Sequence, residues 1–89
     1  MNPHTAKICI VDDDPFTLKV LEQLLQQAGH IIYPYLSVRQ ALENIPSLNA
    51  DMILMDVQMK EMDGFEACRL LKKNEQTASI PLLFVTIMD

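Results

Sequence analysis

Short, unbroken runs of apolar residues alternate along the chain with segments in which apolar residues recur every three or four positions. The runs are 8–11, 31–33, 52–55 and 81–85. Unbroken runs of this length, rich in β-branched residues, are typical of strands that a sheet buries on both faces. The segments between them are 15–28, 37–44 and the residues that follow Gly64. The pattern therefore predicts four strands that alternate with three helices.

The predicted helices have recognisable ends and apolar faces. Pro15 opens the first helix, and Gly29 stands where a glycine often ends one. The sequence from Ser37 to Gln40 has the form of a capping box, which opens the second helix; residues 46–50 then read as a loop. Helical spacing predicts that the apolar faces of the first and third helices comprise Phe16, Val20, Leu21, Leu24, Leu25 and Ala28, and Phe65, Cys68, Leu70 and Leu71.

Strands that alternate with helices predict an α/β fold with a doubly wound parallel sheet, because parallel strands need crossover connections. Pro34 places the second strand at or near an edge of this sheet. The functional site of such a fold lies at the carboxyl ends of the strands, where the strand order reverses. Asp12, Asp13, Asp56 and Thr86 directly follow apolar runs. We therefore expect these side chains to converge in space.

The composition narrows the possible classes of function. The chain has 89 residues, 49% of them apolar, which suits one domain. Its net charge of −5 and its lack of a basic stripe argue against a nucleic-acid surface. The apolar runs are too short to cross a membrane, and no signal peptide is visible. Cys9 and Cys68 match no metal-binding spacing and are interpreted as core residues, so we expect a cytoplasmic domain.

The acids at the strand ends indicate a chemistry. Asp14 stands directly before the first helix and is expected to cap it, but capping does not explain Asp12, Asp13 or Asp56. Carboxylates that lie within a few Å of one another repel, and burial raises their pKa further unless a cation neutralises them. Mg²⁺ suits such a site and leaves one carboxylate free to attack phosphorus. The Thr86 hydroxyl can then donate to a phosphoryl oxygen.

Four blocks of the sequence together carry a resemblance to a known family. They are 8–15, 52–59, 62–66 and 81–86. In this order and spacing they make the chain, from about Lys7 to Asp89, resemble the receiver domain of two-component response regulators. The resemblance implies a flavodoxin-like fold and a signalling switch that takes part in its own phosphotransfer but is not a turnover enzyme.

The resemblance also implies roles for single residues. Asp13 would ligate Mg²⁺ directly, and Asp12 would assist, often through water. Asp56 would take the phosphoryl group from a histidine kinase or phosphotransfer protein and would also be a metal ligand. The backbone carbonyl of Gln58 would be a further metal ligand, and Thr86 would be the switch hydroxyl that turns toward the phosphate.

The chain departs from the family pattern in its length. Receiver domains typically have five βα units, each a strand followed by a helix. This chain ends at Asp89. We therefore expect an N-terminal tail at residues 1–6 and, at residues 7–89, a receiver domain with four of the five units. The fourth helix, fifth strand and fifth helix would be missing, and with them the lysine that pairs with the acyl phosphate. The run 82–85 would then form an open edge, which predicts self-association or domain swapping.

Three further sites can be compared with the family pattern: two depart from it and one matches it. Ile87 stands where the family usually has a small residue, and it would narrow access to the phosphoryl pocket. Lys60 stands where the family often has proline, which is interpreted as a minor departure. The Asp63–Gly64 pair matches the family and is expected to set the turn into the third helix, a structural role.

Other functions remain open on the sequence alone. A receiver-like module that works through protein contacts, without phosphorylation, is favoured by the missing lysine and by Ile87. Asp12, Asp13 and Asp14 after a strand also resemble the acids of haloacid-dehalogenase-type phosphatases, but Phe16 stands where those enzymes have Thr or Val. A flavodoxin-type flavin site would need hydroxyls and backbone donors where this chain has acids.

Overall fold

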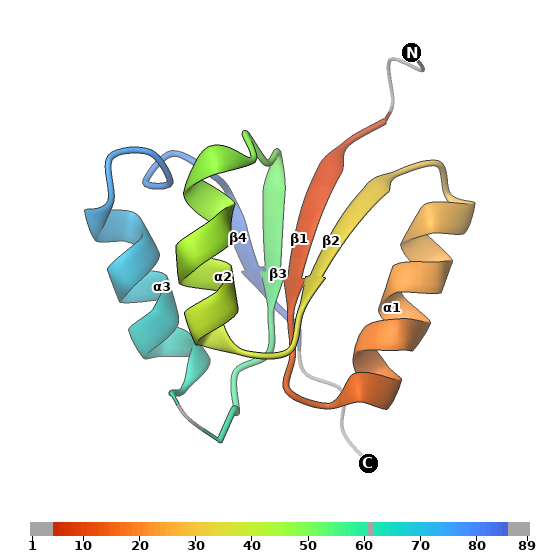
Figure 1. Cartoon of the computed structure of the whole chain (residues 1–89), viewed down its shortest axis with the longest axis horizontal. Helices are drawn as coiled ribbons and strands as arrows, with labels where there is room; N and C mark the ends of the chain where they lie inside the picture. The colour runs from red at the N-terminus through yellow and green to blue at the C-terminus, as the bar shows by residue number, and fades with distance from the viewer. Residues whose placement is uncertain (1–4, 61, 86–89) are drawn as a thin grey trace.

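The computed structural model describes residues 5–60 and 62–85. The elements in chain order are β1 (Lys7–Val11), α1 (Pro15–Gln27), β2 (Ile31–Tyr35), α2 (Val38–Asn44), the 3₁₀ helix η1 (Ile45–Ser47), β3 (Met52–Met55), α3 (Gly64–Lys73) and β4 (Leu82–Phe84). All strand pairs are parallel, and the strand order is β2-β1-β3-β4. The predicted parallel sheet with helices between its strands is confirmed (Figure 1).

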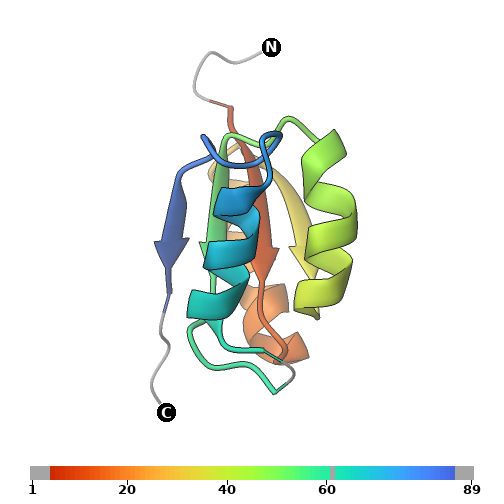
Figure 2. The same cartoon turned by 90° about the vertical axis from the view of Figure 1, so that its left-hand side faces the viewer.

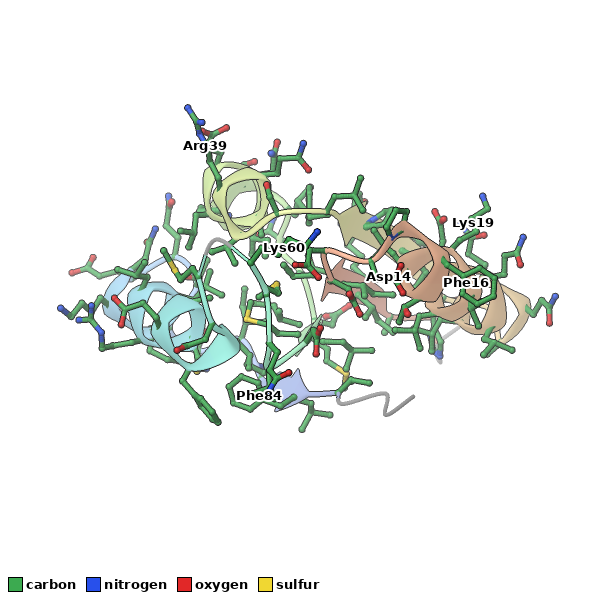
Figure 3. All side chains as sticks on the ribbon, turned by 90° about the horizontal axis from the view of Figure 1, so that it is seen from below. Asp14, Phe16, Lys19, Arg39, Lys60 and Phe84 are labelled. Atoms are coloured by element: carbon green, nitrogen blue, oxygen red, sulfur yellow. The ribbon has the colours of Figure 1, made fainter. Side chains whose placement is uncertain are left out.

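Helices cover both faces of the sheet, so the fold is doubly wound. One cluster of buried residues joins β1 and β2 to α1 and comprises Ile8, Ile10, Leu18 and Ile32. The other cluster joins the sheet to α2 and α3 and includes Cys9, Val11, Val38, Ala41, Ile53, Met55, Ala67 and Leu71. The two layers of helices are visible on opposite sides of the strands when the sheet is viewed from the end (Figure 3). Alternate residues of each strand therefore enter different cores.

β2 forms one edge of the sheet, as Pro34 predicts, and it runs two residues further than expected. The Ile31 N–H donates to Ala6 O, and Tyr35 O accepts from the Asp12 N–H. In a parallel ladder, alternate residues direct their backbone groups to the same neighbour. Pro34, which lies between residues of this set, directs its backbone toward the open edge. Its missing N–H therefore costs the sheet no hydrogen bond.

The helix ends follow the predicted signals. Ser37 accepts a hydrogen bond from the Gln40 N–H, and Asp63 accepts one from the Glu66 N–H. Gly29 has a φ of 98°, the left-handed conformation in which glycine ends a helix at no steric cost. The expected loop at 46–50 is partly wrong, since its first residues belong to η1, which packs its buried Ile45 into the core.

The predicted apolar faces of the helices need correction. Phe16 and Leu24 of α1 are 76% and 56% exposed, whereas Leu18, Leu21 and Leu25 face the sheet. The apolar stripe of α1 is wider than the surface that the sheet can cover, so its outer members stay in water. Phe65 of α3 is 62% exposed, yet its ring packs against Phe84 of β4, with the two ring centroids 4.9 Å apart. The small Gly64 and Ala67 are the buried residues of this helix face.

Both cysteines are free thiols, as their spacing suggests. Cys9 is fully buried in β1, and burial raises the pKa of its thiol to about 11. Cys68 is half-buried in α3. Cys9 thus acts as a small apolar side chain in the core, as expected, whereas Cys68 is not a member of either buried cluster.

β4 lies at the other edge of the sheet (Figure 2). Leu82 packs against the core on the α3 side, but Leu83 and Phe84 are 53% and 38% exposed. Ile53 donates to Pro81 O, and Val85 donates to Met55 O. The backbone groups of the alternate residues, Leu82 and Phe84, therefore point away from β3.

No helix within the described ranges is long and apolar enough to cross a membrane.

Candidate functional site

Acidic side chains meet at the carboxyl end of the sheet, where β1 and β3 end side by side. The ladder pairs Val11 with Met55, so the residues that follow these strands begin from neighbouring positions. One carboxylate oxygen each of Asp12, Asp13 and Asp56 lies within 4.8 Å of the others. The expected convergence of these three acids is therefore present in the structure. Thr86 and Ile87 lie outside the described residues.

Asp12 is the most buried of the acids, with 7% of its surface exposed. Its Oδ1 accepts a hydrogen bond of 2.9 Å from the Asp14 N–H. Burial raises the pKa of the Asp12 carboxyl, and the negative charges of Asp56 and Asp13 add to this, while the bond from Asp14 opposes it. Ionisation of Asp12 is thus costly, and a bound cation would offset that cost.

Asp13 is half-buried and holds the loop that follows β3. Its Oδ2 accepts a hydrogen bond of 2.8 Å from the Lys60 N–H. Both residues line a cavity of about 90 Å³, whose full lining comprises Asp13, Leu36, Ser37, Val38, Met59 and Lys60. The loops after β1, β2 and β3 therefore meet around one side of the acids. Lys60 and Asp14 both lie near the centre of the view onto this end of the sheet (Figure 3).

Asp14 serves the helix, as its position before Pro15 predicts. Its Oδ1 accepts from the Phe16 N–H at 3.3 Å, and the Thr17 hydroxyl donates to its Oδ2 at 2.6 Å. The Thr17 hydrogen bond lowers the pKa of the Asp14 carboxyl. Asp14 is not a member of the group of converging acids. Asp14 thus caps α1, whereas Asp12, Asp13 and Asp56 form the candidate site.

Asp56 is half-buried, and its backbone is fixed on two sides. Its N–H donates to Val11 O at 3.0 Å, which continues the pairing of β3 with β1. Gly64, at the start of α3, packs so closely that a Cβ there would lie 2.5 Å from the Asp56 carbonyl oxygen and 3.0 Å from Val57 Cα. Gly64 also donates its N–H to Val57 O at 2.7 Å. The glycine is therefore required by the close approach of α3 to the acid.

The donor set fits a hard divalent cation. Mg²⁺ binds oxygen ligands at about 2.1 Å, so ligands on opposite sides of the ion lie about 4.2 Å apart. The separation of up to 4.8 Å between the carboxylate oxygens is close to that span. Gln58 is exposed in the loop after β3, and its carbonyl remains a predicted ligand.

Lysines at the end of α3 do not contribute to this site. The Lys72 ammonium donates to Ala78 O at 3.2 Å and to Ile80 O at 2.7 Å. It therefore stabilises the segment that leads into β4. Lys72 and Lys73 occupy the last turn of α3, where positive charge is favourable.

The sequence interpretation missed the contribution of Lys60. Its N–H is the donor to Asp13, although the residue was treated as a minor departure from proline. A signal was available, because a residue other than proline at this position brings a backbone N–H to the site loop.

Comparisons with known proteins agree with this geometry. The model of the response regulator receiver domain family matches residues 8–89. The chain is 33% identical over 84 residues to Protein PilH of Pseudomonas aeruginosa, covering 94% of this chain and 69% of that protein. It is 37% identical over 71 residues to hybrid signal transduction histidine kinase C of Dictyostelium discoideum, covering 80% of this chain but 6% of the kinase.

Solved structures show the same fold. The N-terminal domain of a response regulator receiver protein from Methanoculleus marisnigri has a TM-score of 0.85 and 30% identity, covering 89% of this chain and 64% of that one. A chemotaxis response regulator of Vibrio cholerae has a TM-score of 0.85 and 30% identity, with coverage of 90% and 67%. The chain thus spans about two thirds of PilH and of these two solved chains, but a much smaller share of the longer relatives.

Proposed function

Because this chain belongs to the response regulator receiver domain family of two-component signalling modules, we propose that it accepts a phosphoryl group on Asp56 with the help of Mg²⁺. The observation that carries the proposal is the approach of three carboxylates to within 4.8 Å at the end of the sheet. Such a group needs a cation to hold its charge. The phosphoryl acceptor and the metal ligands can then come from the same set of acids.

Each acid has a distinct role in this proposal. Asp13 would hold Mg²⁺ directly and Asp12 would assist, often through water, with the Gln58 carbonyl as a further ligand; Mg²⁺ held there would supply positive charge for the transferring phosphoryl oxygens. An Asp56 oxygen attacks phosphorus, an O–P bond forms, and the N–P bond to the donor histidine breaks. The donor imidazole keeps the electron pair and takes up a proton. Thr86, by resemblance to the family, would turn its hydroxyl toward the new phosphate.

The proposed partner is a histidine kinase or a phosphotransfer protein. Similarity to segments of two histidine kinases, one of them a hybrid kinase, supports this assignment. The rim beside the acids is partly apolar, because Leu36, which is 46% exposed, lines the same cavity as Asp13, and this suits a protein surface. The free thiols of Cys9 and Cys68 agree with a reducing compartment, so we place the domain in the cytoplasm.

Intact mass after incubation with Mg²⁺ and acetyl phosphate tests the proposal. The wild-type chain should gain the mass of one phosphate, and Asp56→Asn should gain none. Asp14→Asn is the matched control, because it changes a neighbouring acid that caps α1, and it should still be modified. Removal of Mg²⁺ with a chelator should abolish the gain. A wild-type chain that is never modified, or a gain that survives in Asp56→Asn, contradicts the proposal.

A second candidate function is protein interaction without phosphorylation, and the β4 edge favours it. Residues 80–85 carry no charge, and Leu83 and Phe84 are partly exposed. In an antiparallel pair of two copies, Leu82 would oppose Phe84 of the second copy through outward backbone groups, and the two Leu83 side chains would meet on one face. The edge is therefore complementary to itself.

Sedimentation velocity over a range of concentrations tests this self-association. The wild-type chain should form a dimer as its concentration rises, and Leu83→Lys should remain monomeric. Ile31→Lys is the control, because Ile31 is a 40% exposed aliphatic residue of the opposite edge strand. A wild-type monomer at every concentration, or equal effects of both substitutions, contradicts the second candidate.

A further inference from the structure

The hydrogen bond between Lys60 and Asp13 joins two loops that are distant in sequence. The Lys60 N–H donates to Asp13 Oδ2 over 2.8 Å, across 47 positions of the chain. The two loops follow β1 and β3, whose ends carry the site acids. The bond therefore fixes the position of one acid relative to the strand that carries another.

The donor in this bond is a backbone group that the core holds in place. Met59 packs against the cluster of buried residues on the α2 and α3 side of the sheet. Lys60 itself is exposed, so its side chain extends into solvent. Because the neighbouring side chain is anchored, the direction of the Lys60 N–H is set by the backbone and does not depend on the ammonium group.

The acceptor uses one oxygen of a carboxylate that has two. Hydrogen bonding occupies Oδ2 of Asp13, and no hydrogen bond to its Oδ1 occurs in the part of the chain that the structure describes. Asp12 is held in the same manner, since its Oδ1 accepts from the Asp14 N–H. Each of the two acids thus accepts a hydrogen bond from a backbone N–H on one oxygen, and one oxygen of each lies within 4.8 Å of the other acids.

We propose that the Lys60 N–H is a positioning group, which orients the Asp13 carboxylate for Mg²⁺. The inference rests on the proposed metal site and adds the group that prepares it. Partners that hydrogen-bond to a metal ligand fix its orientation, and their loss typically weakens metal binding about 10- to 100-fold. The N–H also draws charge from the carboxylate, which acts in the opposite direction. The orienting effect should prevail, because three repelling carboxylates would otherwise turn apart.

The test removes the N–H while it keeps the side chain. A chain of 89 residues is within reach of chemical synthesis, so the amide between Met59 and Lys60 can be replaced by an ester. Calorimetric titration with MgCl₂ compares this ester with the wild-type chain, with Lys60→Pro and with Lys60→Ala. The ester and Lys60→Pro should bind Mg²⁺ about tenfold more weakly. Lys60→Ala keeps the N–H and should stay within about twofold of wild type.

A second set of measurements shows whether the effect passes through Asp13. In an Asp13→Ala background, the ester should change the remaining Mg²⁺ affinity by less than about twofold, because the acceptor is absent. Circular dichroism establishes that each variant is folded, and Lys60→Pro provides the second N–H deletion.

The inference is overturned if the ester binds Mg²⁺ as tightly as wild type. It is also overturned if the ester weakens binding equally with and without Asp13, because the bond would then have only a general structural role. A wild-type chain that does not bind Mg²⁺ overturns the proposed function itself, so the two failures are distinguishable.

Discussion

The central strands of the sheet and the edge strand β4 have the same kind of apolar sequence but are buried to different depths. β1, β3 and β4 each come from an unbroken apolar run. Ile10 and Ile53, at the centre, are each 1% exposed, because strands flank them and helices cover them. Leu83, in the same kind of run, is 53% exposed at the edge. Neighbouring elements, and not the run itself, decide how deeply a strand is buried.

This difference explains where the site is built. Asp12 and Asp56 follow the two strands that are paired on both sides, so their backbones are fixed by hydrogen bonds. Asp13 is then oriented by a loop that is itself tied to the core through Met59. A group of repelling acids needs such a frame, whereas an edge strand can remain partly exposed and available for contacts.

The largest expected effect is the loss of stability when a central isoleucine is truncated, compared with a leucine at the β4 edge. Ile53→Ala removes a fully buried side chain and should lower the free energy of unfolding by about 3–4 kcal/mol. Leu83→Ala removes a half-exposed side chain and should cost less than about 1 kcal/mol. Urea unfolding followed by circular dichroism measures both. Equal losses would show that β4 is buried in solution, for example by a second copy.

Two glycines sharpen the contrast between the site and the rest of the chain. Gly64→Ala places a Cβ against the Asp56 carbonyl, and overpacking of this kind should cost about 2 kcal/mol. Gly29→Ala meets no atom within 4 Å but must hold a φ of 98°, which should cost about 1 kcal/mol.

Phosphorylation by acetyl phosphate distinguishes these glycines better than stability does. Gly64→Ala should slow the modification of Asp56, because the backbone of the acceptor must shift to admit the methyl group. Gly29→Ala should leave the rate unchanged, since Gly29 lies at the far end of α1. Equal rates in the two variants would show that α3 can retreat without moving Asp56.

Much of this frame follows from the sequence, because the relevant signals are local. The apolar runs and the caps at Asp14, Ser37 and Asp63 are patterns within a few residues, and the strands and helices formed close to their expected bounds. The convergence of the acids followed from the rule that parallel strands end at the same edge. The roles assigned to Asp12, Asp13, Asp56, Gln58 and Thr86 stay predictions.

The predictions of helix faces were wrong where the apolar stripe of a helix is wider than the surface that the sheet can cover. Phe16 and Leu24 have the spacing of core residues but are 76% and 56% exposed. Phe65, which is 62% exposed, contacts the sheet at its edge, where its ring centroid lies 4.9 Å from that of Phe84. The Lys60 bond to Asp13 was missed because it depends on a backbone N–H whose partner is 47 positions away. Because the donor is a backbone group, the type of side chain at position 60 does not predict this bond.

Asp12 should show that the site costs stability. Asp12→Asn keeps an oxygen to accept from Asp14 but removes a buried negative charge, so the Mg²⁺-free protein should be more stable than wild type at neutral pH. Saturating Mg²⁺ should stabilise the wild-type chain and should stabilise Asp12→Asn less. Thermal unfolding with and without Mg²⁺ measures both effects. A destabilised Asp12→Asn would mean that the carboxylate makes a favourable contact in the metal-free fold.

The smallest effect is the pH dependence of that gain. Burial raises the pKa of Asp12 above its ordinary value of 3.8, so the native state binds a proton more readily than the unfolded chain. The penalty of ionised Asp12 is therefore full above its native pKa, shrinks as the pH falls through that pKa, and vanishes below the ordinary value. The exposed Asp14, whose pKa is lowered, acts in the opposite sense, since its contribution is lost on acidification.

The wild-type chain and Asp12→Asn both contain Asp14, so the difference between their stabilities isolates the effect of Asp12. Unfolding in Mg²⁺-free buffer should show the two stabilities converging as the pH falls from 7 toward 3.8. A difference that stays constant over this range would assign the effect of Asp12→Asn to packing and not to charge.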